Sequence, residues 1–262
     1  MKEVKEILER VSAFGPDERG ILATVVDVQG SGYRLPGARM LMLGNGDTFG
    51  MVSGGCLEAD VLERAKKVLA SGRAEVFRYD TTNDENSVFS LNMGCRGVVR
   101  ILLESVGREN SLLTNLRRIR ENRETRTVAT LISSGIGSEV DLGRRLFYEG
   151  EGRFTADKLP DSLQDLQTLQ EKCVSFHDSD KAYGFQKVET TEGTFEFAFE
   201  SMMPPVSLLL FGAGADSIPL ARIGSELGWQ VSVFDHRPTF LTKERFAGAD
   251  RLILHNDENP MA

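Results

Sequence analysis

The hydrophobic positions of the first 200 residues alternate between helical and strand spacing. Val4, Ile7, Leu8 and Val11 recur every three or four residues, which predicts an amphipathic helix. Residues 20–28 form a run rich in β-branched side chains, as is typical of a buried strand. The same spacing predicts further helices over 57–69, 110–124 and 161–172, and strands over 38–43, 48–52, 74–79, 98–103, 128–132, 184–189 and 194–200. We therefore expect a mixed α/β domain over residues 1–203, without an evident internal repeat.

A second domain is predicted after Pro204 and Pro205, which suit neither a helix interior nor a central strand. An apolar strand (206–211), a Gly-Ala-Gly turn, a helix (218–227), a strand (230–234) and a third strand (251–254) follow in order. Gly212 and Gly214 allow a tight turn and close approach to a pyrophosphate, and Asp235 stands where an acid can bind a ribose hydroxyl. This order indicates a Rossmann-like parallel-sheet domain over residues 204–262.

The Rossmann-like pattern holds fewer strands than a doubly wound sheet, so we expect an incomplete domain with an open sheet edge. A shortened chain is compatible with this pattern, and so is an edge that a partner protein covers. The alternative that the domain has the fold without binding a nucleotide also stays open, because fold does not imply function.

Composition narrows the class of protein. The 262 residues are 40% hydrophobic and carry a formal net charge of −8. This charge argues against non-specific electrostatic binding to nucleic acid or anionic membranes. The basic run at 116–126 is interleaved with glutamates and is interpreted as a solvated helix face. No secretory signal or membrane-spanning run is evident, and three widely spaced cysteines predict reduced thiols in the cytoplasm.

Two cysteines lie in glycine-rich loops. Cys56 follows Gly54 and Gly55 directly before a predicted helix, where exposed amides and the helix N-terminus favour anions and thiolates. Cys95 lies between a glycine and the positive Arg96. The alternative is that both are small buried hydrophobic residues that fit tight turns.

Arginines accompany a third glycine-rich loop, at residues 30–37. Arg34 lies within it and Arg39 directly after it, and guanidinium groups suit a phosphate. The alternative is a rigid turn with a surface arginine. Cys173 ends a predicted helix and is interpreted as inert, and the spacing of cysteines and histidines predicts no metal site.

Five segments together resemble the XdhC/CoxI family, the xanthine dehydrogenase accessory proteins. They read GSGYRLPGARM (30–40), VSGGCLEADV (52–61), GCRG (94–97), PPVSLLLFGAGADSIPLA (204–221) and VSVFDHRPTF (231–240). The third departs from the family's usual GCGG at Arg96. The resemblance implies an accessory protein, rather than an enzyme, that binds molybdenum cofactor and supports its sulfuration. It also implies delivery to a molybdenum hydroxylase of the xanthine dehydrogenase type, a cysteine desulfurase as sulfur donor, and a homodimer.

The resemblance also suggests roles for the residues singled out above. Cys56 and Cys95 would contact the cofactor or handle sulfur, with Gly54, Gly55, Arg34 and Arg39 as partners of its phosphate. The residues alone leave two other classes open. One is an NAD(P)-dependent oxidoreductase that holds its nucleotide through the Gly-Ala-Gly turn and the acid that follows it. The other is an inactive scaffold that docks a partner enzyme.

Overall fold

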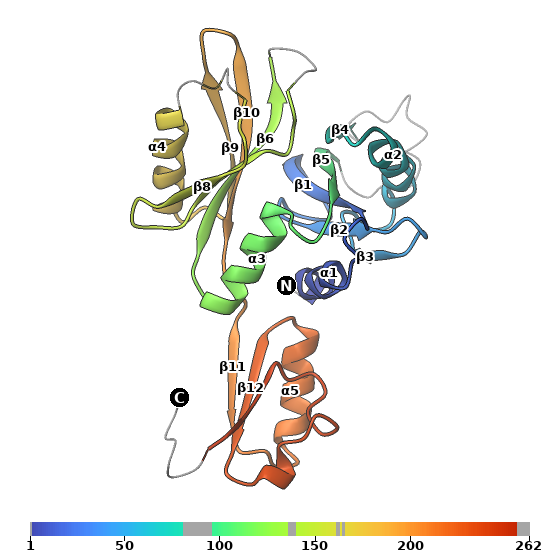
Figure 1. The fold of residues 1–262 in the computed structure, drawn as a ribbon, viewed down its shortest axis with the longest axis vertical. Helices are drawn as coiled ribbons and strands as arrows, with labels where there is room; N and C mark the ends of the chain where they lie inside the picture. The colour runs from blue at the N-terminus through green and yellow to red at the C-terminus, as the bar shows by residue number, and fades with distance from the viewer. Residues whose placement is uncertain (1, 81–95, 136–139, 161–162, 164–165, 256–262) are drawn as a thin grey trace. The chain divides into compact units, whose positions relative to one another are not determined.

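A computed structural model describes residues 2–80, 96–135, 140–160, 163 and 166–255 of the chain (Figure 1). The chain divides into a larger unit, Glu6–Met203, and a smaller unit that combines Met1–Lys5 with Pro204–Ala262. The break at Pro204 coincides with the hinge predicted from the two prolines. The first five residues, which the sequence assigned to the N-terminal domain, group instead with the smaller unit.

The larger unit holds two five-stranded sheets among its described residues. The first has the order β3-β2-β1-β5-β4 and the second the order β8-β7-β6-β10-β9. The strands of the first are β1 (Gly20–Gly30), β2 (Arg39–Met42), β3 (Thr48–Gly50), β4 (Glu75–Asp80) and β5 (Gly97–Val106). Those of the second are β6 (Arg126–Ser134), β7 (Arg145–Tyr148), β8 (Phe154–Ala156), β9 (Tyr183–Glu189) and β10 (Thr194–Met202). The helices are α1 (Lys2–Ser12), which belongs to this unit from Glu6 onward, α2 (Glu58–Ser71), α3 (Ser111–Asn122) and α4 (Leu166–His177).

The two sheets are two copies of one topology. The first half of the larger unit extends from α1 to β5, and the second half from α3 to β10. Each half contains a helix, three antiparallel strands, a second helix and two further strands, and the strand orders of the two sheets match position by position. Individual residues repeat as well: Thr24 is the cross-strand partner of Arg39, and Thr130 is the partner of Arg145. The expectation of a chain without an internal repeat is therefore wrong at the level of structure.

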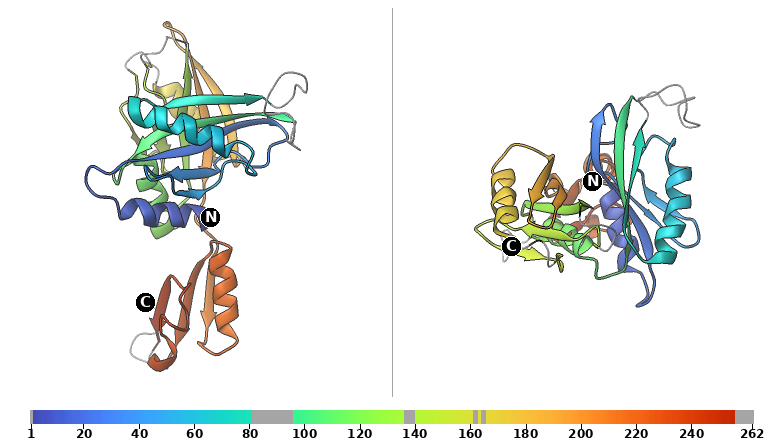
Figure 2. Two further views of the ribbon diagram at one scale, coloured as in Figure 1. Left: turned by 90° about the vertical axis from the view of Figure 1, so that its right-hand side faces the viewer. Right: turned by 90° about the horizontal axis from the view of Figure 1, so that it is seen from above.

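The outer face of each sheet is covered by one helix, so that α2 and α4 lie on opposite outer sides (Figure 2). The buried residues of the two helices follow the same spacing: Val61, Ala65 and Val68 in α2, and Leu169, Cys173 and Phe176 in α4. Cys173 thus occupies the place that Ala65 has in the first half. It is completely buried, as a small hydrophobic residue would be, and burial raises the pKa of its thiol to about 12.

The inner faces of the sheets meet in a small core of equivalent residues. Val26 and Leu102 come from the first sheet, and Ile132 and Ala198 from the second. Val26 and Ile132 each lie two residues after the threonine of their half, and Leu102 and Ala198 each lie two residues before a glutamate that pairs across the interface. The sheets therefore contact each other through the same positions of both copies.

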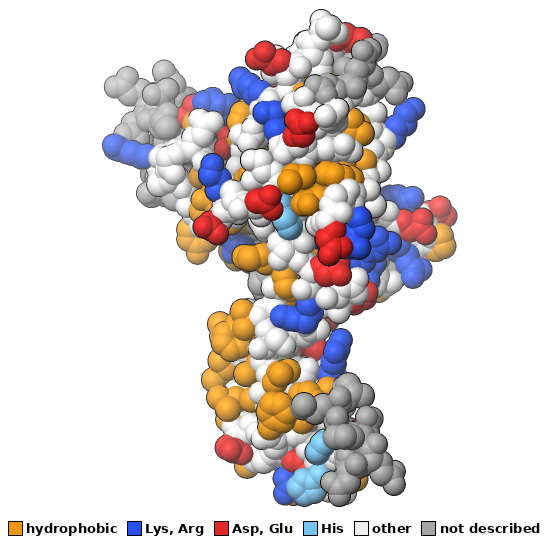
Figure 3. All heavy atoms as spheres, turned by 90° about the vertical axis from the view of Figure 1, so that its left-hand side faces the viewer, with side chains coloured by type: hydrophobic (Ala, Val, Ile, Leu, Met, Phe, Trp, Pro, Cys, Tyr) orange, Lys and Arg blue, Asp and Glu red, His pale blue; other side chains and the backbone are white. Residues whose placement is uncertain are grey.

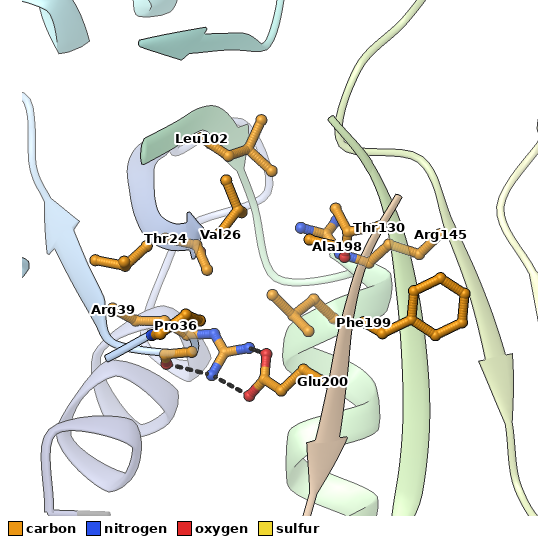
Figure 4. A pocket seen from close by; sticks show the side chains of 13 residues that line it. Thr24, Val26, Pro36, Arg39, Leu102, Thr130, Arg145, Ala198, Phe199 and Glu200 are labelled. Atoms are coloured by element: carbon orange, nitrogen blue, oxygen red, sulfur yellow. Dashed lines mark hydrogen bonds and ion pairs between the residues drawn. The ribbon is translucent and has the colours of Figure 1, made fainter. Parts of the chain in front are cut away.

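Two reciprocal ion pairs cross this interface. Arg39 of β2 donates two hydrogen bonds to Glu200 of β10, at 3.1 and 2.6 Å. Arg145 of β7 donates two to Glu104 of β5, one of them at 2.9 Å. Burial opposes the charge of Arg145, but the carboxylate of Glu104 outweighs it and raises the arginine's pKa. Figure 4 shows Arg39 reaching Glu200 across the cavity between the sheets, with Arg145 on its far side.

Two other expectations need correction. The helix predicted over 161–172 is α4, which runs to His177, and the start predicted for it lies outside the described residues. Arg126, taken from sequence as part of a solvated helix face, is instead buried at the start of β6, where it donates hydrogen bonds to Asn115 and Glu149, both at 2.6 Å. The short strands β7 and β8 were not predicted.

The described residues of the smaller unit, which end at 255, contain a three-stranded parallel sheet of the Rossmann-like class in the order β11-β12-β13. Its elements are β11 (Ser207–Phe211), α5 (Ser217–Glu226), β12 (Gln230–Asp235), a short 3-10 turn (Pro238–Phe240) and β13 (Arg251–Leu254). Leu210 is buried in the core with α5, whereas Leu209 and Phe211 alternate with it and are exposed. Figure 3 shows hydrophobic side chains gathered on one face of this unit.

Candidate cofactor-binding site

Three segments of the first half lie at the same end of its strands: the loop after β1, the loop between β3 and α2, and the residues directly before β5. We call this end of the sheet the first-half edge. The edge is set by strand direction: β1 and β5 are antiparallel, with Gly30 opposite Gly97, so the loop after β1 and the segment before β5 are neighbours. Strand β3 is antiparallel to β2, which is itself antiparallel to β1, so β3 also ends at this edge and leads into α2. The topology therefore brings together the glycine-rich segments that the sequence singled out.

Direct contacts hold these loops against one another. Ser31 donates its backbone N–H to the carbonyl of Arg96 at 3.1 Å, and the N–H of Arg96 donates to the Ser31 hydroxyl at 3.0 Å. A Cβ added at Gly54 would lie 3.1–3.3 Å from three atoms of the Tyr33 ring. Near-equal distances to three adjacent ring atoms place the backbone of Gly54 under the face of the ring. Only glycine fits there without a shift, and Tyr33 is otherwise 66% exposed.

The Cys56 loop is organised by the buried side chain of Ser53. The Ser53 hydroxyl donates to a carboxylate oxygen of Glu58 and accepts from the backbone N–H groups of Gly55 and Leu57, each at 3.1 Å. Helix α2 begins after Leu57, so Cys56 lies one residue before the cap of this helix. Its thiol is exposed, and its sulfur lies 3.7 Å from the Ser53 hydroxyl oxygen.

The structure separates the other predicted site residues. Arg34 is half-buried in the same loop as Tyr33, beside the Cys56 loop. Arg39 is only 4% exposed. Its guanidinium binds Glu200 of the second sheet and donates to the carbonyl of Gly37 at 2.8 Å, so it is engaged inside the larger unit. Cys95 lies outside the described residues. Three residues that sequence reasoning missed, Tyr33, Ser53 and Glu58, have no recognisable spacing signal, because Ser53 and Glu58 are five residues apart and do not form a capping box.

In the smaller unit, the loop that follows β11 is hydrogen-bonded to Asp235, the acid predicted to bind a ribose. Gly212 has φ +107°, which favours glycine, and leads from β11 towards α5 past Gly214. Asp235 at the end of β12 accepts the N–H of Ala213 at 2.6 Å and both the N–H and the guanidinium of Arg237 at 2.8–2.9 Å. The Arg237 guanidinium and the Ala213 amide hold the pKa of Asp235 far below its usual range. The carboxylate expected to bind a ribose is thus engaged within the loop.

The first-half edge offers groups that suit an anionic, sulfur-rich ligand. An exposed thiol at Cys56 is a soft ligand, and Gly54 and Gly55 beside it are also exposed. The half-buried Arg34 in the neighbouring loop adds a positive charge. These residues therefore fit a ligand that combines a metal–sulfur centre with an anionic group. Within the described residues no helix is long and apolar enough to cross a membrane.

The chain belongs to the XdhC and CoxI family. Residues 15–80 match this family, and residues 208–259 match the XdhC Rossmann domain. Its relatives include a protein of Bacillus subtilis described as a probable xanthine dehydrogenase component, 30% identical over 238 residues, which cover 90% of this chain. They also include the molybdenum cofactor insertion chaperone PaoD of Escherichia coli, 29% identical over 113 residues and 43% of this chain.

A crystal structure of a xanthine dehydrogenase from Bacillus halodurans has the same fold. It superposes with a TM-score of 0.67 at 26% identity, covering 97% of this chain and 68% of that one. The present chain spans 65% of the length of the Bacillus subtilis relative and 35% of the Escherichia coli relative. The mixed α/β architecture and the Rossmann-like second domain predicted from the sequence are confirmed.

Proposed function

We propose that this chain is a molybdenum cofactor accessory protein that binds the cofactor at the first-half edge of its larger unit. The observation that carries the proposal is that the loop with the exposed thiol of Cys56 contacts the 30–37 loop through Gly54 and Tyr33, and that this second loop contacts Arg96 through Ser31. A similar protein is a molybdenum cofactor insertion chaperone. The cofactor presents a dithiolene-bound metal and a phosphate. A thiol suits the first, and the guanidinium of Arg34 suits the second.

The role we propose is binding and transfer, without turnover of a small substrate by this chain. The cofactor would be held while its terminal sulfido ligand is installed by a cysteine desulfurase and would then pass to a molybdenum hydroxylase of the xanthine dehydrogenase type. The names of the relatives support this class of target. An exposed thiol is reachable by both partners, which supports a site at the surface. A homodimer, implied by the family resemblance, belongs to the same proposal.

The alternative of an NAD(P)-dependent oxidoreductase has less support. It relies on Gly212, Gly214 and Asp235, and both oxygens of Asp235 already accept hydrogen bonds from Ala213 and Arg237. A ribose hydroxyl would have to displace one of these bonds. The family match of this segment is to the XdhC Rossmann domain.

The test is anaerobic binding of molybdenum cofactor released from a purified molybdenum hydroxylase. The wild-type chain should retain it, and Cys56→Ala and Cys95→Ala identify the contribution of each loop. Cys173→Ala is a matched control, because it removes one thiol that is completely buried in α4 and lies outside the loops of the proposed site. Absence of retention together with stoichiometric binding of NAD would refute the proposal and move the function to the Gly212 loop.

A further inference from the structure

The Ser53 side chain uses its full hydrogen-bonding capacity within the Cys56 loop. A hydroxyl has one donor and two acceptor sites. Ser53 gives its proton to Glu58 and receives the N–H groups of Gly55 and Leu57, and the Cys56 thiol also donates to it at 3.7 Å. The N–H of Ser53 donates to the other oxygen of Glu58 at 2.9 Å. One buried side chain therefore fixes the backbone on both sides of Cys56.

Glu58 fixes the direction of this hydroxyl. Burial opposes the charge of the carboxyl, but the bonds from the Ser53 side chain and from the amides of Ser53, Glu58 and Leu57 outweigh it and hold its pKa below its ordinary value. An ionised carboxylate accepts only, so it orients the Ser53 proton away from the two loop amides. We call this arrangement of Ser53 and Glu58 the loop clamp.

The internal repeat shows that the fold itself does not require the loop clamp. When α4 is aligned with α2 through Leu169 and Val61, position 166 is equivalent to Glu58 and is a leucine, 37% exposed. The sequence preceding it, LPDSLQD at 159–165, has neither glycine nor cysteine. Both helices nevertheless form and bury the same three positions. Leu166 has no carboxylate, so among the described residues the clamp is found in the half that has the exposed thiol.

We propose that Ser53 and Glu58 are positioning residues, which hold the loop so that the Cys56 sulfur and the two glycines before it face the ligand. The inference rests on the proposed function, in which Cys56 contacts the cofactor. Neither residue touches the ligand. Glu58 acts through Ser53, and Ser53 acts through the loop backbone and through its contact with the Cys56 thiol. The partial burial of a charged carboxylate is the cost of this arrangement, and an open, preorganised loop is the gain.

The experiment compares Ser53→Ala, Ser53→Thr and Glu58→Gln in the full chain. Asp60→Asn is the matched control, because Asp60 lies in the same helical turn and has the same charge but binds Arg64 and the Tyr79 hydroxyl instead of the loop. Two quantities are measured for each variant: hydrogen exchange of the amides at residues 55 and 57, and anaerobic retention of molybdenum cofactor released from a purified molybdenum hydroxylase.

We expect Ser53→Ala to accelerate exchange at both amides and to weaken retention roughly tenfold, the equivalent of about 1.4 kcal/mol. Ser53→Thr, which keeps the hydroxyl, should restore both, and Asp60→Asn should change neither. Unaltered exchange in Ser53→Ala overturns the clamp whether or not the wild type retains cofactor. Faster exchange with wild-type retention overturns the positioning role. If the wild type retains nothing, the proposed function fails, and the exchange data alone still decide whether the clamp exists.

Discussion

Removing the carboxylate of Glu104 should destabilise the larger unit, because it leaves the guanidinium of Arg145 buried without its ionic partner. Arg145 is 2% exposed and the Glu104 side chain 8%, and the two form a bidentate pair between the sheets. Breaking a buried pair by removing one partner costs about 3–5 kcal/mol. At roughly 2–4 °C per kcal/mol for a unit of this size, Glu104→Ala should lower the unfolding midpoint by about 6–20 °C.

The repeat supplies a matched control for this measurement. Glu200→Ala removes the equivalent carboxylate, but the Glu200 side chain is 23% exposed, so water can partly solvate the remaining Arg39 and the loss should be smaller. The double variant of Glu104 and Arg145, both to alanine, should recover part of the loss because no unpaired charge is left. Thermal and urea unfolding followed by circular dichroism measure all three. A Glu104→Ala variant within about 1 kcal/mol of wild type would refute the reasoning.

Three further outcomes are expected. Iodoacetamide should modify Cys56 in the folded chain but Cys173 only after unfolding, because burial raises the pKa of Cys173 to about 12; mass spectrometry of native and denatured samples decides this. Gly54→Ala should displace the Tyr33 ring and weaken cofactor retention, and adding Tyr33→Ala should relieve the clash, so equal binding by wild type and Gly54→Ala would contradict the contact. The pKa of Glu58 is lower in the folded than in the unfolded chain, so its carboxylate stabilises the fold above the ordinary pKa near 4.5, and this stabilisation is lost as the pH falls through the folded pKa. The unfolding free energies of wild type and Glu58→Gln should therefore converge in acid. A difference between the two that grows as the pH falls would contradict a lowered pKa.

Most helices and strands were predictable because their apolar positions follow a clear period. The sequence signal failed at β7 and β8, which span four and three residues and are too short to show alternation. Arg145 opens β7 as a charged residue, and its burial depends on Glu104, which is 41 residues away in the chain. The local pattern of hydrophobic and polar residues contains no information about a partner so distant in sequence. From that pattern alone, a buried arginine cannot be distinguished from an exposed one.

The internal repeat was hidden for a related reason. The shared residues are few, chiefly Thr24 and Thr130 with the arginines beside them and the glutamates opposite, and the loop lengths differ between the halves. The same reasoning applies to Arg39: next to a glycine-rich loop it resembles an exposed anion-binding residue, but it is buried and its partner Glu200 lies 161 residues later. The loops around Cys56 were recognisable because glycine and cysteine clusters are rare in regular elements. Their meeting at one edge follows only from the strand order.

The most direct test of the account is retention of molybdenum cofactor by the purified full chain under anaerobic conditions, with Cys56→Ala and Cys173→Ala measured in parallel. Both variants remove one thiol, but Cys56 is exposed at the loop edge and Cys173 is buried against the second sheet. The account predicts retention by wild type and Cys173→Ala and its loss in Cys56→Ala. Equal retention by all three proteins would contradict a site at the Cys56 loop.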